Sequence, residues 1–259
     1  MSSAIAPLQQ ANACMALPLS DSDTLCGDLF VNLATRRVPF TFGHLTLAVE
    51  VSTAACTDHD LTGQTTWPGA SILCHWLAAQ PASFFAASTP ALELGAGTGL
   101  AGLYFYARGG DIRLTDYQPV VLDLLKRNAA SVTIDVASGG SVHVSPLLWG
   151  DSAAHTELLS HTPDSRGFPV LLAADVVYPG SQAALPGLVD SVCSLLAPGG
   201  SLFLSYCSRA KTTDVALFDA IRDAGLETQQ VSDVRHEGCV SGVVYRVQRS
   251  TGGPRPLGT

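Results

Sequence analysis

Charged side chains are scarce in this sequence: only 14% of its 259 residues are Asp, Glu, Lys or Arg, with 14 basic residues against 22 acidic ones. The resulting formal charge of −8 argues against a nucleic-acid partner, because clustered Lys and Arg supply most non-specific affinity for phosphates. A basic protein partner suits this charge better. Long apolar runs are missing too, since the hydrophobic residues are spread over alanines and short strands, and no run approaches the ~20 residues that span a bilayer. We therefore expect a soluble chain without a membrane partner.

Paired cysteines and metal-binding spacings are also absent. The seven cysteines are scattered without any C-x-x-C pair, which favours reduced thiols in the cytoplasm or, alternatively, the nucleus. The N-terminal residues lack the basic and apolar regions of a signal peptide and the early Arg of a transit peptide. The histidines show neither H-x-x-H nor H-E-x-x-H spacing, so no metal is implied. No G-x-S-x-G elbow supports acyl transfer.

Composition along the chain predicts one domain between two loose ends. Residues 1–28 are rich in Ala, Ser, Pro and Gln and predict a flexible arm, whereas the Gly- and Pro-rich residues 250–259 predict a disordered tail. Residues 29–249 are long enough for a single domain with a substantial core. Within them, Val38 to Val51 alternate apolar and polar residues around Gly43-His44, which predicts a β-hairpin.

Strand-like and helix-like segments alternate through the rest of the chain. Strands are expected just before Gly95 and at residues 111–116, 142–146, 170–174, 202–207, 228–234 and 243–248. Helices are expected after Pro68, Leu100 and Pro119, and at residues 181–196 and 214–224. This order predicts an α/β fold: a doubly wound, seven-stranded, mostly parallel sheet with an antiparallel C-terminal edge, preceded by the hairpin.

The most informative stretch is the glycine-rich turn after the first of these strands. Glu93 ends an apolar run, and Gly95, Gly97 and Gly99 follow at alternate positions before a helical pattern that starts at Leu100. Glycines allow positive φ or close approach of a ligand, and a helix N-terminus offers free N–H groups. A dinucleotide site requires a small residue where Leu100 stands. The spacing E-x-G-x-G-x-G instead favours a different cofactor loop.

Residues at the carboxyl ends of neighbouring strands should converge on the same ligand. Asp116 is placed to accept hydrogen bonds from ribose hydroxyls, although it could instead cap the helix after Pro119. Trp149 could lie flat against an adenine or be a core residue. Trp67 suggests a lid over the cofactor. Asp175 could orient an amine that receives a transferred group, or cap the following helix.

Taken together, these segments resemble the methyltransferase-like 21 branch (family 16) of protein-lysine methyltransferases, which are class I, seven-β-strand enzymes dependent on S-adenosylmethionine. The resemblance is carried by Trp67-Pro68, Glu93 to Gly99, Thr115-Asp116, Asn128, Leu148-Trp149-Gly150 and Ala174 to Tyr178. It implies a Rossmann-like, monomeric enzyme that transfers a methyl group from S-adenosyl-L-methionine to a lysine side chain of a protein substrate. The implied cofactor-binding residues are Trp67, Glu93, Gly95, Ala96, Gly97, Thr98, Gly99, Asp116, Tyr117, Leu148, Trp149 and Ala174. The implied catalytic residues are Asp175 and Tyr178.

Other functions remain open at this point. The acceptor could be an amine of a nucleic acid or a small molecule, since the segment from Asp175 to Tyr178 is similar to the D-P-P-Y loop of base methyltransferases, but it lacks the prolines. The chain could also be a non-catalytic interaction protein that keeps a cofactor pocket. A nicotinamide oxidoreductase is disfavoured by Leu100. The hairpin and the loop from His161 to Gly167 are less typical of the resembled family, which leaves the identity of the substrate open.

Overall fold

The computed structural model describes residues 34–53, 62–132 and 139–250. The arm expected at residues 1–28 lies outside the described residues, as does the expected tail apart from Ser250. The predicted hairpin is confirmed: β1 (Thr35–Phe42) pairs antiparallel with β2 (Leu45–Ser52). Gly43 takes a φ of +60° in the turn between them, a conformation that glycine adopts without a steric penalty.

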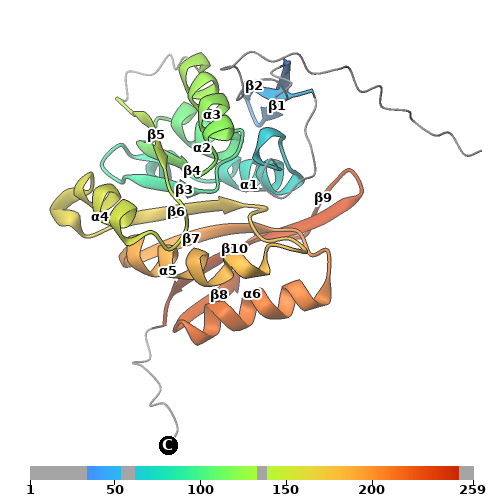
Figure 1. Cartoon of the computed structure of the whole chain (residues 1–259). Helices are drawn as coiled ribbons and strands as arrows, with labels where there is room; N and C mark the ends of the chain where they lie inside the picture. The colour runs from blue at the N-terminus through green and yellow to red at the C-terminus, as the bar shows by residue number, and fades with distance from the viewer. Residues whose placement is uncertain (1–33, 54–61, 133–138, 251–259) are drawn as a thin grey trace, which may run out of the picture. The chain divides into compact units, whose positions relative to one another are not determined.

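The remaining strands form the predicted doubly wound sheet, drawn in Figure 1. They are β3 (Ala91–Leu94), β4 (Ile112–Asp116), β5 (Val142–Pro146), β6 (Phe168–Ala174), β7 (Leu196–Tyr206), β8 (Leu226–Gln230), β9 (Arg235–Glu237) and β10 (Val240–Arg249). The order is β5-β4-β3-β6-β7-β10-β8, and β9 pairs with β10 beside this path. All pairs from β5 to β7 are parallel, while β10 is antiparallel to both β7 and β8. The chain order reverses between β3 and β6, where doubly wound sheets bind their ligands.

Helices cover both faces of the sheet (Figure 1). One hydrophobic cluster packs α1 (Pro68–Ala78), α2 (Leu100–Ala107) and α3 (Pro119–Ser131) against one face. A second cluster packs α4 (Ser152–Ser160), α5 (Leu185–Leu195) and α6 (Lys211–Asp223) against the other. Short 3-10 helices lie at Thr62–Gln64, Ala82–Phe85, Pro163–Ser165 and Gln182–Ala184. Within the described ranges, no helix has both the length and the apolarity needed to cross a bilayer.

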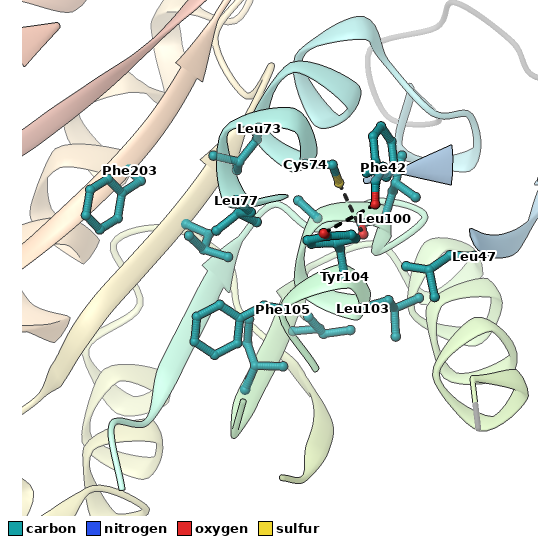
Figure 2. Close-up of a cluster of buried hydrophobic side chains, with 14 of the residues drawn as sticks. Phe42, Leu47, Leu73, Cys74, Leu77, Leu100, Leu103, Tyr104, Phe105 and Phe203 are labelled. Atoms are coloured by element: carbon teal, nitrogen blue, oxygen red, sulfur yellow. Dashed lines mark hydrogen bonds between the residues drawn. The ribbon is translucent and has the colours of Figure 1, made fainter. Parts of the chain in front are cut away.

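The hairpin is part of the first cluster, which Figure 2 draws. Phe42 and Leu47 are buried there beside Tyr104 of α2, and the rings of Phe42 and Tyr104 meet edge to face with centroids 5.7 Å apart. The Tyr104 hydroxyl donates to the backbone oxygen of Phe42, and the Cys74 thiol donates to that of Leu100 (Figure 2). Burial of this cluster therefore attaches the hairpin to the helix that follows the glycine turn.

Two predicted boundaries after β6 are wrong. The helix expected from residue 181 starts as a 3-10 turn and becomes α-helical only at Leu185. Pro186 in its first turn explains this start, since proline suits the first helical positions and lacks the N–H that an interior position needs. The strand expected from Leu202 begins at Leu196, which pairs with Phe168 of β6. Pairing resumes only at Ser201, opposite Val170, so Pro198-Gly199-Gly200 lie in an irregularity inside β7, where Gly199 takes a φ of +74°.

The C-terminal edge is also more divided than the sequence predicts. The strand expected at residues 228–234 ends at Gln230, and β9 follows as a separate strand that pairs with the start of β10. The last strand runs from Val240 instead of Val243, because its additional residues pair with β9.

Candidate functional site

A cavity of about 510 Å³ lies where β3, β4, β5 and β6 end. Its volume falls within the range of ~300–1,000 Å³ that is typical of small-molecule sites. Every predicted site residue except Gly99 contributes to its lining. These lining residues are Trp67, Glu93, Gly95, Ala96, Gly97, Thr98, Asp116, Tyr117, Leu148, Trp149, Ala174, Asp175 and Tyr178. The residues that the sequence predicts for one site therefore lie around one cavity in the structure, apart from Gly99.

The glycine turn after β3 forms one wall of the cavity. Gly95 and Gly97 have φ values of +62° and +54°, and the N–H of Gly97 donates to a carboxylate oxygen of Asp116 at 3.1 Å. A Cβ on Gly95 would lie 3.0 Å from the ring of Trp149. Gly99 does not line the cavity: it is the N-cap residue of α2, with a φ of +82°, and a Cβ there would lie 2.5 Å from Leu125. Its glycine is required by the turn and by packing.

Asp116 closes the turn from the end of β4. Besides Gly97, its carboxylate accepts the N–H groups of Tyr117 at 2.8 Å and Gln118 at 3.4 Å. Burial raises the pKa of this carboxyl group, and the three N–H donors act in the opposite direction. The side chain makes no capping bond to α3, whose N-cap is Gln118, so the alternative of a cap on that helix does not describe its geometry. Asp116 holds the loop and keeps its carboxylate on the cavity wall.

Glu93 lies at the floor of the cavity, and its residue is 2% exposed. Its Oε2 accepts the N–H of Gly102 at 2.9 Å. Loss of hydration raises the pKa of Glu93 to about 8, the Gly102 N–H opposes this rise, and the charge of Asp116 adds to it. Glu93 is therefore mainly protonated at neutral pH.

Trp149 is half-buried, with its ring over Gly95 and its backbone against α5. A Cβ on Gly187 would lie 2.6 Å from the Trp149 carbonyl oxygen. The next residue, Gly150, donates its N–H to Ser191 Oγ at 3.0 Å, and that hydroxyl also lies 2.9 Å from Nε2 of the buried His155. Trp149 packs against the second hydrophobic cluster and also lines the cavity. A role in the core and a role in stacking on an adenine are therefore compatible.

The segment before α1 is a part of the site that sequence reasoning missed. Thr62, Gly63 and Thr65 line the cavity, although the sequence patterns gave none of them a role in the site. The indole N–H of Trp67 donates to the Thr62 carbonyl oxygen at 2.8 Å. Gly63 approaches the glycine turn so closely that a Cβ on Gly97 would lie 3.1 Å from its carbonyl oxygen. A glycine among threonines just before Trp67 was the available signal.

Asp175 follows the last residue of β6 with a φ of +58°, and both oxygens of its carboxylate accept hydrogen bonds. Arg209 donates to its two oxygens at 2.7 and 2.9 Å, and the N–H of Gly69 donates to Oδ2 at 2.9 Å. Gly69 is the second residue of α1, so Asp175 caps that helix from a distant part of the chain instead of capping the helix that follows it. Sequence reasoning missed Arg209, whose signal was its position just beyond the predicted strand at 202–207.

Tyr178 and the residues after it form the side of the cavity next to Asp175. The Tyr178 hydroxyl lies 3.4 Å from Thr62 Oγ1, and its backbone N–H donates to Ser181 Oγ at 2.9 Å. Gly180, Ser181 and Gly187 also line the cavity. Sequence reasoning assigned Ser181 and Gly187 only to a helix and gave Gly180 no role, because a helical pattern does not reveal which residues face a ligand.

Comparisons with known proteins agree with this architecture. A family model described as lysine methyltransferase matches residues 53–224. EEF1A lysine methyltransferase 3 of Mus musculus is 32% identical over 149 residues, which cover 56% of this chain and 56% of that protein. The protein of the same name in Xenopus tropicalis is 30% identical over 155 residues, or 60% of this chain and 62% of that protein. Protein N-lysine methyltransferase METTL21A of Danio rerio is 30% identical over 141 residues, covering 54% and 58%. The chain thus spans less than two thirds of these relatives' length.

Solved structures support the fold. A 16S rRNA methyltransferase of T. thermophilus superposes with a TM-score of 0.52 at 13% identity, covering 83% of this chain and 51% of that one. A transferase from Pyrococcus horikoshii gives 0.51 at 12% identity, with coverages of 83% and 72%. The resemblance read from the motifs is confirmed by the family match, which extends over more than half of the sequence. The chain belongs to the lysine methyltransferase family.

Proposed function

We propose that this protein is an S-adenosylmethionine-dependent N-methyltransferase whose acceptor is a lysine side chain of a protein. One observation carries the proposal: the glycine turn, Asp116 and Trp149 line a single cavity at the carboxyl ends of the strands, in a chain of the lysine methyltransferase family. The four cysteines among the described residues are free thiols (Cys74, Cys193, Cys207 and Cys239), which supports a reducing compartment, the cytoplasm or the nucleus. We further propose that the protein acts as a monomer.

The residues present fit the proposed cofactor. Gly95 leaves room beside the Trp149 ring that a Cβ would fill, and the Asp116 carboxylate is the kind of acceptor that a ribose diol requires. Leu148 and Tyr117 are exposed residues, 60% and 44% exposed, that line the same cavity as Trp149, on whose ring an adenine could stack. When bound, S-adenosylmethionine would supply a methyl group on a sulfonium sulfur, to which a neutral amine could form a bond as the S–C bond breaks and S-adenosylhomocysteine leaves.

The chain contributes alignment and exclusion of water to this reaction. A lysine of pKa ~10.4 must lose a proton first, which costs about 5 kcal/mol at pH 7. An apolar slot lowers this cost because it disfavours the charged ammonium. Tyr178 lines the acceptor side of the cavity, and its hydroxyl oxygen can accept a hydrogen bond from the amine and orient its lone pair.

Ligand-dependent stability tests the cofactor assignment. We expect S-adenosylhomocysteine at 100 times its Kd to stabilise the fold by ~2.7 kcal/mol, which corresponds to a rise in Tm of roughly 5–10 °C for a domain of this size. NAD should not change the Tm. Asp116→Ala is the control, because it removes an acceptor from the wall and should abolish the rise. Stabilisation by NAD alone would refute the proposal.

Labelling tests the acceptor. Incubation of a cell extract with tritiated S-adenosylmethionine, followed by identification of the labelled residue, should reveal a methylated protein lysine. EEF1A is the first purified acceptor to test, because two relatives are named for it. Label on RNA or on a small molecule would favour the corresponding alternative acceptor. Tight binding of S-adenosylhomocysteine without any transfer would favour a non-catalytic, cofactor-binding protein.

A further inference from the structure

Arg209 and Asp175 lie just beyond the ends of two neighbouring parallel strands, β7 and β6. Nη1 of Arg209 is 2.7 Å from Oδ1 of Asp175 and Nη2 is 2.9 Å from Oδ2, so the guanidinium donates to both oxygens. The Asp175 side chain has no exposed surface and that of Arg209 is 23% exposed. Paired hydrogen bonds between charged groups are strong and geometrically specific, and breaking one partner of a buried pair is strongly unfavourable.

The same carboxylate fixes the start of α1. Oδ2 accepts the Gly69 N–H at 2.9 Å, and a Cβ on Gly69 would lie 2.9 Å from the Cβ of Asp175, so glycine is needed for this approach. The Arg209 guanidinium carbon lies 5.7 Å from the ring centre of Trp67, the residue before α1. Surrounding contacts must hold Asp175 at its positive φ, which non-glycine residues rarely adopt. The ion pair therefore connects two strand ends to an aromatic wall of the cavity.

The segment that carries Arg209 is itself anchored. Asp214, in the first turn of α6, accepts hydrogen bonds from the Tyr206 hydroxyl at 2.6 Å and the Ser208 hydroxyl at 2.8 Å. Both donors lie within three residues of Arg209. The guanidinium is thus presented to Asp175 from a fixed backbone.

We propose that Arg209 is a positioning residue for methyl transfer, which holds Asp175 and, through Gly69 and Trp67, the cavity wall beside the acceptor. This inference rests on the proposed function. Because Arg209 occupies both carboxylate oxygens, an incoming ammonium meets a neutral ion pair and no free carboxylate. Asp175 then acts through the scaffold, and the amine is oriented by other groups on the acceptor side, such as Tyr178.

Four variants separate positioning from direct action of Asp175. Arg209→Gln and Asp175→Asn each break the pair, and the double variant asks whether the two effects are shared. Arg209→Lys keeps the charge but loses the planar fork, so it should rescue only part of the function. Arg222→Gln is the matched control, because Arg222 pairs with Asp219 at 2.7 Å on the surface, with exposures of 67% and 47%.

The first readout needs no turnover. The chain has three tryptophans, so its fluorotryptophan NMR spectrum is simple to assign with single Trp→Phe variants. We expect the Trp67 signal to shift in Arg209→Gln and in Asp175→Asn without ligand, and to stay in place in Arg222→Gln. Calorimetry should show S-adenosylhomocysteine binding weakened about tenfold in both pair-breaking variants, the scale of a partly lost aromatic contact. The double variant should bind no more than about twofold more weakly than either.

The second readout is turnover with EEF1A as the acceptor probe. Misplacement of reacting groups by about 1 Å can cost ~10²-fold in rate. We therefore expect kcat to fall by about that factor in Arg209→Gln and in Asp175→Asn, while the KM for EEF1A changes little. The pH profile of kcat should keep its wild-type midpoint in Asp175→Asn, because Asp175 does not take the proton of the amine. A shifted profile in Asp175→Asn, together with near wild-type turnover in Arg209→Gln, would overturn the proposal. A Trp67 signal unaffected by either variant would do the same. If the wild-type chain transfers no methyl group to any acceptor, the proposed function fails, and the NMR result still decides the positioning role.

Discussion

Glu93→Gln should remove a pH dependence of stability that the wild-type fold carries. Glu93 is buried under the glycine turn and accepts one backbone hydrogen bond, from Gly102 at 2.9 Å. Burial, with the nearby Asp116 charge, raises its pKa from an ordinary value of 4.5 to about 8. Glutamine has nearly the same shape and can still accept from Gly102, but it cannot ionise.

The sign of the effect follows from proton uptake. Between pH 4.5 and 8 the folded protein keeps a proton on Glu93 that the unfolded chain has released, so the free energy of unfolding falls as pH rises through this window. A difference of 3.5 between 8 and 4.5 corresponds to about 5 kcal/mol at ~1.36 kcal/mol per pKa unit. Against a typical total stability of ~5–15 kcal/mol, this loss is large enough to measure.

Urea unfolding of wild type and Glu93→Gln at intervals from pH 4.5 to 9 measures the effect. We expect the variant to gain stability relative to wild type as pH rises, with the difference levelling off above pH 8. The difference in stability between the two proteins is free of the contribution of His75, which is the same in both. Burial is the main reason why the pKa of His75 is lowered, and its contribution to stability changes in the opposite direction at low pH. A difference that stays constant over the whole range would show that Glu93 is already ionised in the folded protein at low pH, which would refute the reasoning.

Three further substitutions test the cavity wall. Gly97→Val should abolish S-adenosylhomocysteine binding in calorimetry, because it forces a β-branched side chain to a φ of +54° with its Cβ 3.1 Å from the Gly63 carbonyl oxygen. Gly238→Val controls for backbone strain, because Gly238 has a φ of +60° and a Cβ there would have no atom within 4 Å. Equal affinities of Gly97→Val and Gly238→Val for the ligand would contradict the prediction. Trp149→Ala should weaken the same binding by roughly 1–3 kcal/mol if the ring stacks on an adenine, whereas loss of circular dichroism with normal residual affinity would indicate a core role alone. Asn128→Ala should lower the free energy of unfolding in urea by about 3 kcal/mol or more, since it leaves three backbone partners unpaired; a change below about 1 kcal/mol would contradict this.

The sequence predicted those parts of the site that depend on local chemistry. The turn from Glu93 to Gly99 could be recognised because positive φ restricts three positions to glycine within a short stretch. Asp116 and Trp149 could be placed because parallel strands bring their carboxyl ends to one edge of the sheet. These inferences need only strand order and spacing.

Pairings between distant segments could not be predicted in the same way. Arg209 and Asp175 are separated by 34 positions, and no periodic pattern indicates that one guanidinium occupies both oxygens of one carboxylate. The start of α5 and the course of β7 were misjudged for a related reason. Glycine and proline usually end an element, but here Pro198 to Gly200 only interrupt the ladder, and β7 resumes its pairing with β6 at Ser201.

Asn128 explains why an N-terminal hairpin belongs to this site. Its side chain is fully buried in α3; its Oδ1 accepts the N–H of Glu50 in β2, and its Nδ2 donates to the carbonyl oxygens of Glu50 and Thr98 at 3.0 and 2.9 Å. Glu50 also receives a salt bridge from Arg127 at 3.2 Å. Thr98 lies inside the glycine turn, so one amide connects that turn to the edge of the hairpin. A displaced hairpin would leave a buried amide unsatisfied beside the turn, and the hairpin thereby stabilises the geometry of the loop that we propose binds the cofactor.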